Sequence, residues 1–117
     1  MPAHEADSRR TQIIQASRQV PAGRWTTYAV VSEIVYGHPK AAQTVGTVMR
    51  EEGRPDSAHR VLRSGGEVAS EWTGLGGGPE ECIRRLRAEG SWDETRNLAR
   101  ADRCVDAAEL RKLQRRS

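Results

Sequence analysis

Short apolar stretches, each ended by glycine or proline, divide the first half of the chain into predicted helices. Ser8 can cap a first helix, over which apolar residues recur every three or four positions. Thr26 can cap a second helix that ends at Gly37, where glycine can adopt the left-handed conformation that closes a helix. Pro39 then opens a third helix, which we expect to run to about Glu52.

The second and third predicted helices, joined by the tight turn around Gly37, have the spacing of a helix-turn-helix with the third helix in the recognition position. One face of the third helix carries Ala41, Val45, Val48 and Met49, which we expect in the core. The outward face carries small or polar residues: Ala42, Gln43, Gly46, Thr47 and Arg50. Glycine in an exposed helix interior costs about 1 kcal/mol relative to alanine, so we expect another molecule to approach the backbone closely at Gly46.

The second half of the chain predicts a hairpin and a further helix. Val61–Arg63 and Glu67–Ala69 read as two short strands around a Ser-Gly-Gly turn. A helix follows from Glu80 to about Glu89 and is expected to bury Cys82. Since a hairpin after a helix-turn-helix is typical of a wing, the sequence predicts a mainly α fold, a winged helix-turn-helix core with a short β-hairpin wing.

Length and composition set the domain organisation. A chain of 117 residues, of which 36% are hydrophobic, supports one domain, since a second would lack a core. We expect a flexible N-terminus at residues 1–7, one domain at 8–110 and a basic tail at 111–117. No apolar run approaches the roughly 20 residues that a membrane span requires, and the first residues lack the apolar segment of a secretion signal. The sequence therefore predicts a soluble, cytoplasmic protein.

Charge favours a nucleic-acid partner and gives no support to a metal site. The chain has 19 basic and 16 acidic residues, and only Lys40 and Lys112 are lysines. The planar fork of arginine suits phosphates and base edges, although a GC-rich genome explains the arginines equally well. Cys82 and Cys104 form no CxxC pair, and the three histidines lie far apart in the sequence. We therefore expect neither a metal ion nor another cofactor.

Four sequence blocks, taken in order, carry a resemblance to a known family. They are Val20–Tyr28, Gly37–Gly46, Ser57–Val61 and Leu86–Gly90. They resemble the DNA-binding domain of the O6-alkylguanine-DNA alkyltransferases, and most closely the alkyltransferase-like proteins, which lack the nucleophilic cysteine. The similarity covers Ile13 to about Leu113.

The third block differs from that of the active alkyltransferases at the reacting position. Those enzymes have Pro-Cys-His-Arg, whereas this chain has Ser57, Ala58, His59 and Arg60. The resemblance places Ala58 at the nucleophile position, and a methyl side chain can neither attack nor hold an alkyl group. His59 and Glu89 match the pair that activates the thiol, and without a thiol they are expected to line the pocket. The resemblance thus implies a protein that is not an enzyme.

Two other groups could act as nucleophiles, and neither fits the reacting position. Ser57 precedes that position and is expected to point elsewhere, while Cys82 lies among apolar neighbours, as buried structural thiols do. The alkyltransferase-like proteins usually have a tryptophan where Ala58 stands, so the pocket here is expected to be roomier.

The resemblance also implies which residues bind DNA and turn the damaged base out of the duplex. They are Thr27, Tyr28, Ala42, Gln43, Gly46, Thr47 and Arg50. Tyr28 matches a tyrosine that crowds the phosphate 3′ to the lesion, although a core tyrosine is the alternative interpretation. Small residues on the third helix fit a close approach to the minor groove. Gln43 departs from the family, which has an arginine finger there, so base extrusion is expected to be weaker.

The alkylguanine pocket implied by the resemblance is made of residues from the second half of the chain. They are Ala58, His59, Arg60, Trp72, Thr73 and Glu89. Trp72 and Thr73 match an aromatic and a hydroxyl that cover the flipped base, while packing in the core explains Trp72 equally well.

The sequence as a whole predicts a non-enzymatic DNA-damage sensor. We expect it to bind double-stranded DNA containing O6-alkylguanine through the minor groove, as a monomer, and to flag the lesion. Nucleotide excision repair proteins are the partners that the resemblance implies. Two alternatives remain open: a winged-helix transcription regulator, which reads the major groove and is usually a dimer, and a DNA repair enzyme that uses another nucleophile.

Overall fold

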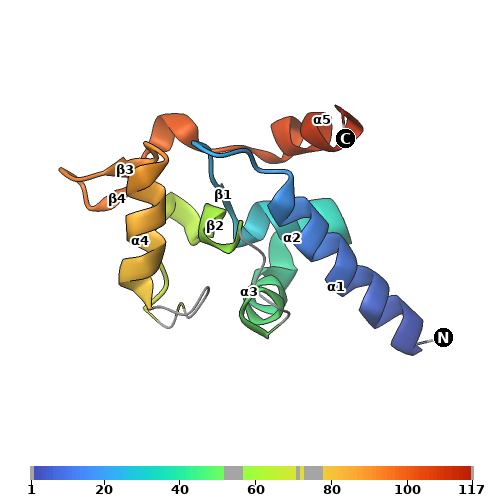
Figure 1. Ribbon diagram of the computed structural model, residues 1–117. Coiled ribbons are helices and arrows are strands. Elements are labelled where there is room, and N and C mark those ends of the chain that lie inside the picture. Colours follow the sequence, from blue (N-terminus) through green and yellow to red (C-terminus); the bar gives the residue numbers. More distant parts are fainter. Residues whose placement is uncertain (1, 52–56, 71, 73–77, 117) are drawn as a thin grey trace.

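Helices are the main elements of the computed structural model, which describes residues 2–51, 57–70, 72 and 78–116, with residues 2–7 and 51 described by their backbone alone. The α-helices are α1 (Pro2–Arg18), α2 (Tyr28–Tyr36), α3 (Ala42–Glu51), α4 (Pro79–Ala88) and α5 (Ala107–Arg116) (Figure 1). The 3-10 turns are η1 (Pro39–Ala41), η2 (Ala58–Arg60), η3 (Ser64–Gly66) and η5 (Ala101–Arg103). The strands are β1 (Thr26–Thr27), β2 (Val61–Leu62), β3 (Trp92–Asp93) and β4 (Leu98–Ala99). Within the described ranges, no helix is both long and apolar enough to cross a bilayer.

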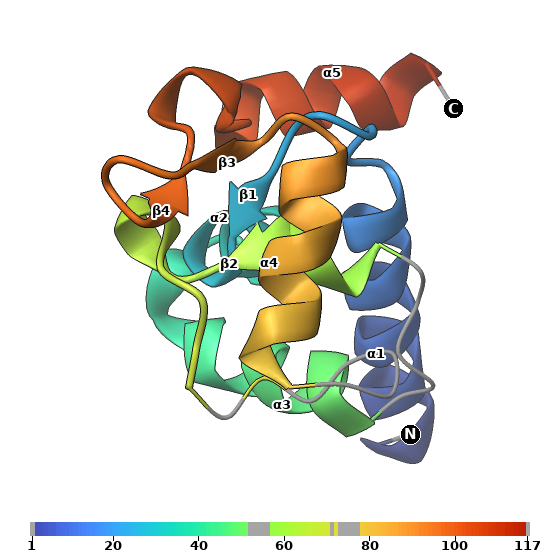
Figure 2. The same ribbon diagram turned by 60° about the vertical axis from the view of Figure 1, so that its left-hand side comes forward.

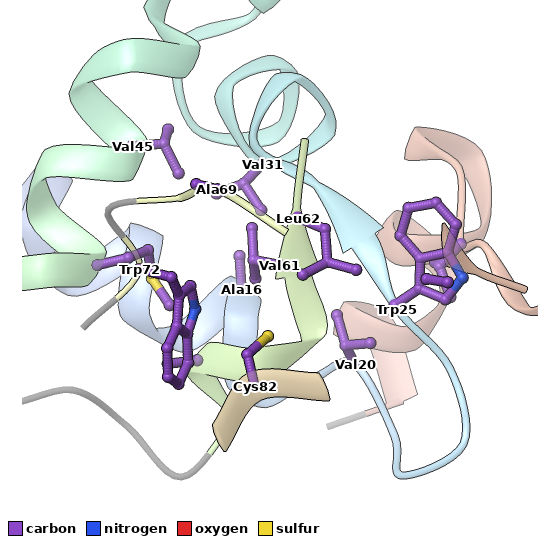
Figure 3. Packing of buried hydrophobic residues seen from close by; sticks show 14 of the residues in the cluster. Ala16, Val20, Trp25, Val31, Val45, Val61, Leu62, Ala69, Trp72 and Cys82 are labelled. Carbon is purple, nitrogen blue, oxygen red and sulfur yellow. The ribbon is translucent and has the colours of Figure 1, made fainter. Parts of the chain in front are cut away.

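A small, mainly aliphatic core joins these elements. Its fully buried members include Ile13, Val20, Val31, Val45, Val61, Leu62, Leu86, Val105 and Leu110. Figure 3 shows part of this cluster, with side chains from the first three helices, β2 and α4 directed toward one another. Burial of one such side chain stabilises the fold by about 1.5–3 kcal/mol. Val45, Val48 and Met49 of α3 are buried as predicted, and so is Cys82 of α4. Ala41 is only half-buried, because it lies in the η1 turn before α3.

The turn between α2 and α3 is fixed by Gly37 and Ser32. Gly37 has a φ of 83°, and its N–H donates to the carbonyl of Glu33 at 2.9 Å, the predicted left-handed helix end. The buried hydroxyl of Ser32 donates to the carbonyl of His38 at 2.6 Å and accepts from the N–H of Ala41 at 3.0 Å. The predicted helix-turn-helix is therefore confirmed, and it is held by a serine that the apolar pattern did not single out.

Thr26 and Thr27 have different roles from the predicted ones. Thr27 caps α2, because its Oγ1 accepts from the N–H of Val30 at 3.1 Å. Thr26 lies in β1, and its hydroxyl donates to the carbonyl of Val105 at 2.7 Å. The helix therefore starts one residue later than predicted, and the threonine before it ties β1 to the C-terminal segment.

The hairpin predicted over residues 61–69 does not form. Both residues of β2 are fully buried, and this interior strand pairs in parallel with β1, with Thr27 opposite Leu62. Residues 67–69 form no strand. The antiparallel hairpin lies later in the chain, between β3 and β4. The predicted fold class is confirmed, with its hairpin at a different place in the sequence.

Both ends of the described chain are helical. α1 begins at Pro2 and not at Ser8, whose hydroxyl instead accepts from the side chain of Gln12 at 3.2 Å within the helix. At the other end, α5 continues through the basic residues up to Arg116. Figure 2 shows α5 and α3 at opposite ends of the molecule.

Gly66, in the turn after β2, packs closely against β4 of the later hairpin. Its φ is 88°, and an added Cβ would lie 2.9 Å from the carbonyl oxygen of Ala99 and 3.0 Å from its nitrogen.

We expect Gly66→Ala to lower the free energy of unfolding by about 2 kcal/mol, from left-handed strain and this clash together. Gly37→Ala is the matched control, because its φ is also positive but nothing lies within 4 Å. Its expected loss is about 1 kcal/mol. Chemical denaturation measures both variants, and equal losses would contradict the close contact with β4.

Candidate nucleic-acid interface

A cleft of about 400 Å³ opens between α3, the start of α2 and the turn after β2. The parallel pairing of β1 and β2 brings its walls together. Tyr28 and Arg63 directly follow the paired residues Thr27 and Leu62. Because the two strands are parallel, both residues lie at the same end of the strand pair. The cleft is lined by Tyr28, Ala29, Ala42, Gln43, Gly46, Arg50, Arg63, Ser64 and Ala69.

Most of the residues predicted to contact DNA lie at this cleft. Those that line it are Tyr28, Ala42, Gln43, Gly46 and Arg50. Thr47 is half-buried and hydrogen-bonds along α3 beside them, while Thr27 is buried and uses its hydroxyl to cap α2. Tyr28 lines the cleft and also packs against the core. Half-buried Tyr28 therefore fits both the core and the surface interpretation.

Gly46 is buried, which corrects the prediction of an exposed glycine on α3. The guanidinium of Arg50 lies over it, since an added Cβ at Gly46 would lie 3.9 Å from Arg50 Nη1. Arg50 Nη2 also donates to Thr47 Oγ1 at 3.4 Å. The inference of an approaching molecule from an exposed glycine therefore does not hold. At this point α3 carries the small residues Ala42 and Gly46, and the long side chain of Arg50 covers part of the helix surface.

The residues predicted for the alkylguanine pocket do not line this cleft. Ala58, His59 and Arg60 form η2, and Ala58 is 3% exposed within the core. Trp72 is also buried in the core. Thr73 lies outside the described residues. Within the described part of the chain, the cleft and the η2 turn are thus separate features. η2 directly precedes β2 in the sequence, and the cleft residues Arg63 and Ser64 directly follow it.

Glu89, directly after α4, binds two side chains of η2. Its Oε2 accepts from His59 Nε2 at 2.9 Å and from Arg60 Nη2 at 2.7 Å, and its Oε1 accepts from Arg60 Nε at 3.1 Å. Arg60 Nη1 donates to the carbonyl of Val20 at 3.0 Å. The side chains of Arg60 and Glu89 are each 18% exposed. This network fixes η2 against α4 and against the segment that follows α1.

Burial and these hydrogen bonds set the charge states of the network. Burial alone would raise the pKa of Glu89, but hydrogen bonds from Arg60 and His59 outweigh it and lower the pKa to about 2. Burial lowers the pKa of His59, against the hydrogen bond to Glu89 that raises it. At neutral pH, Glu89 is therefore ionised and the neutral His59 donates from Nε2. Its buried Nδ1 has no partner among the described residues.

Neither thiol of the chain is poised to react. Burial raises the pKa of Cys82 to about 12, and its Sγ lies 3.7 Å from the carbonyl of His59. Burial also raises the pKa of Cys104. The hydroxyl of Ser57 lies 3.3 Å from that of Ser17 on α1. Among the described residues, no group of three His, Cys, Asp or Glu side chains could hold a metal ion.

Arg63 and Ser64 are cleft residues that the sequence analysis missed. The sequence predicts a hairpin strand and its turn at these residues, which would place them on a wing. Their true position follows from the parallel pairing of β2 with β1, two segments far apart in the sequence. The signal that could have found them is the pair of adjacent apolar residues, Val61 and Leu62, which is typical of an interior strand.

Comparison with known proteins gives two matches. Residues 8–91 match the sequence profile of the family described as 6-O-methylguanine DNA methyltransferase, DNA binding domain. The fold is similar to that in the crystal structure of S. pombe Atl1 in complex with damaged DNA containing O6-carboxymethylguanine, with a TM-score of 0.62 and 28% sequence identity. That match covers 73% of this chain and 78% of the other. No curated protein matches the sequence at a significant level.

Proposed function

Because the chain belongs to the family of the 6-O-methylguanine DNA methyltransferase DNA-binding domain, we propose that it is a non-enzymatic sensor of DNA damage. It binds O6-alkylguanine lesions through the minor groove, turns the damaged base out of the duplex and flags it for repair. The observation that carries this proposal is the cleft that Tyr28 of α2 and Gln43 and Gly46 of α3 line together. The similarity to a relative bound to damaged DNA supports alkylguanine as the ligand.

The surface of α3 supports docking in the minor groove. That groove is narrow, and a helix can enter it only where its side chains are small. Ala42 presents a small side chain at the cleft, and Gly46, buried beneath the Arg50 guanidinium, adds none. Arg50 lies at the far end of the same helix face, where its guanidinium can turn from Gly46 to a phosphate.

Tyr28 is the residue that we assign to base extrusion. Its ring packs against the core on one side and lines the cleft on the other. A ring held in this way cannot move aside when the lesion strand enters, so it displaces the strand and favours the extruded nucleotide. Gln43 lies across the same cleft and can occupy part of the space that the base leaves.

The absence of alkyl transfer is part of the proposal and can be tested by mass. Ala58 offers no nucleophile, and the raised pKa of Cys82 keeps that thiol protonated at neutral pH. After incubation with a duplex containing O6-methylguanine, the intact mass of the protein is expected to stay unchanged. A gain of one methyl group in place of a proton would contradict the sensor and favour an enzyme.

Recruitment completes the proposed role. A protein that binds a lesion without removing it contributes to repair only by presenting the site to others, and we propose nucleotide excision repair proteins as these partners. We also propose that the sensor acts as a monomer, because one cleft accounts for one flipped nucleotide.

Gln43→Arg tests whether α3 enters the duplex beside the flipped base. Arginine adds charge and a planar group that can stack in the vacated space, so affinity for lesion DNA is expected to rise by about 1 kcal/mol, roughly fivefold. Fluorescence titration of lesion and undamaged duplexes measures the change. A selective gain for the lesion duplex supports insertion. An equal gain for both would show attraction to phosphates alone, and unchanged binding would place Gln43 away from DNA.

A further inference from the structure

The second half of α5 carries a cluster of exposed positive side chains: Arg111, Lys112, Arg115 and Arg116. Within the described part of the chain, no carboxylate forms an ion pair with any member of this cluster. Exposed arginines on α4 are paired, as Arg84 is with Glu81 and Arg87 with Glu94. The end of α5 thus holds positive charge that the described residues do not neutralise.

The spacing of these charges works against the helix that carries them. Arg111 and Arg115 lie four positions apart, and so do Lys112 and Arg116. Like charges at this spacing are neighbours on the helix surface and destabilise the helix. Positive charge in the last turn favours the helix dipole, but this effect does not extend to Arg111 and Lys112 in the turn before. An anion from outside the chain would relieve the repulsion.

A groove of about 440 Å³ lies along α5 and changes in character from one end of the helix to the other. Its lining residues are Asp106, Ala108, Glu109, Lys112, Leu113 and Arg116. The carboxylates belong to the start of α5, the positive side chains belong to its later turns, and Ala108 and Leu113 add apolar surface. The groove therefore suits a ligand with both acidic and apolar groups.

The two carboxylates of the groove are engaged at the start of α5. Asp106 Oδ1 accepts from the N–H of Glu109 at 2.8 Å, which caps the helix. Glu109 Oε2 lies 2.8 Å from Arg24 Nη1. Both carboxylates are thus fixed at one end of the groove, where they disfavour a second negative charge.

The cluster lies far from the surface that we assign to DNA. Figure 2 shows α5 at the opposite end of the molecule from α3, which lines the cleft. The fully buried Leu110 fixes α5 to the core, and the exposed positive side chains lie on its solvent face. These charges therefore stay accessible when a duplex occupies the cleft.

We propose that this face of α5 binds an acidic segment of a partner protein, with an apolar side chain of that segment in the groove. The inference rests on the proposed lesion-binding function and names the surface by which the sensor presents its lesion to a repair protein. Charge complementarity selects an acidic ligand. A peptide fits better than a second duplex, because DNA carries a phosphate at every step and would bring some against Asp106 and Glu109. A peptide can place its carboxylates over Lys112 and Arg116 alone.

Three short fluorescein-labelled peptides test the proposal. The first has glutamates around a central leucine, the second has glutamine in place of each glutamate, and the third has serine in place of the leucine. Fluorescence anisotropy measures their binding to the free protein and to the protein saturated with an O6-methylguanine duplex. A labelled undamaged duplex is offered to the saturated protein as the competing polyanion.

Lys112→Gln/Arg116→Gln removes the two positive charges that line the groove. Arg18→Gln/Arg96→Gln is the matched control, because it removes two exposed positive charges outside the groove, one from α1 and one from the turn between β3 and β4. All four side chains are exposed, so both variants are expected to keep the Tm of the wild-type protein. Thermal unfolding checks this.

We expect the wild-type protein to bind the glutamate peptide at least about fivefold more tightly than the glutamine peptide. Lys112→Gln/Arg116→Gln should remove this preference, and the control variant should keep it. Serine in place of leucine should weaken binding, because the groove then loses its apolar contact. Saturation with the lesion duplex should leave the affinity for the glutamate peptide unchanged.

Equal binding of the glutamate and glutamine peptides would overturn the proposal, and so would a preference that both double variants lose alike. If serine for leucine changed nothing and Lys112→Gln/Arg116→Gln released a second duplex from the saturated protein, α5 would be a DNA site instead. Each of these results leaves the sensor function standing, since lesion preference is measured separately. If the wild-type protein showed no lesion preference, the free protein would still report on α5.

Discussion

Replacing Glu89 by alanine is expected to lower the free energy of unfolding by about 3 kcal/mol. The variant removes the acceptor for four hydrogen bonds, one of them from the N–H of Gly23, and leaves the largely buried guanidinium of Arg60 without its counter-charge. We expect the lower end of the range for broken buried ion pairs, because the Arg60 side chain keeps 18% of its exposure and can reach water. Thermal unfolding should show a fall in Tm of roughly 10 to 20 °C.

Glu94→Ala is the control for this prediction. Glu94 also pairs with an arginine, Arg87, but both side chains are more than half exposed. Exposed ion pairs contribute little to stability, so little change is expected. If both variants lost the same stability, the Glu89 network would have no special structural role.

The same network predicts an acid-sensitive fold. The pKa of Glu89 falls from an ordinary value of 4.5 to about 2 on folding, so the unfolded chain binds more protons between these values. Stability is thus expected to fall as the pH drops through this range. Glu89→Gln should flatten the loss, and urea denaturation at a series of pH values measures it. His59, whose pKa burial lowers, adds a loss that begins below its ordinary value of 6.5 in both proteins.

Replacing Tyr28 by alanine is expected to weaken binding of lesion DNA by about 1 to 3 kcal/mol, roughly 5- to 150-fold. The ring lines the cleft, and in the proposed mode of binding it displaces the lesion strand. The domain should stay folded, because Tyr28 is only half-buried and the fully buried side chains around it remain. Fluorescence anisotropy with an O6-methylguanine duplex measures affinity, and thermal unfolding measures stability.

Tyr36→Ala is the matched control for Tyr28→Ala. Tyr36 ends the same helix, is also half-buried, and lies under the guanidinium of Arg9, whose Cζ is 4.5 Å from the ring centroid. It does not line the cleft, so lesion binding should be unchanged. A collapse of stability in Tyr28→Ala without a selective loss of lesion binding would make Tyr28 a core residue only.

Local signals in the sequence predicted the helices well. The left-handed end at Gly37 and the buried face of α3 follow from residue type and spacing alone, and both are present in the structure. The family resemblance relates Glu89 to His59 only as a matched pair, and no local pattern relates residues 30 positions apart, so the sequence did not predict their direct hydrogen bond.

The errors share a physical cause. A strand of two residues has no alternation to read, so the pairing of β2 with β1 could not be distinguished from a local hairpin. That error also concealed Arg63 at the cleft. Gly46 was judged exposed from its helix face, but the long side chain of Arg50 folds back over it. Contacts made by flexible side chains and by distant segments depend on the tertiary fold, which single-sequence patterns do not contain.

Lesion preference is the claim on which this account depends most directly. Two duplexes of identical sequence, one with a single O6-methylguanine and one with guanine, are titrated with the wild-type protein at one fixed salt concentration, because phosphate contacts make affinity salt-dependent. We expect the lesion duplex to bind at least about tenfold more tightly, the size of one stacking or extrusion contact. Equal affinity for the two duplexes would contradict the sensor and leave a general DNA-binding domain.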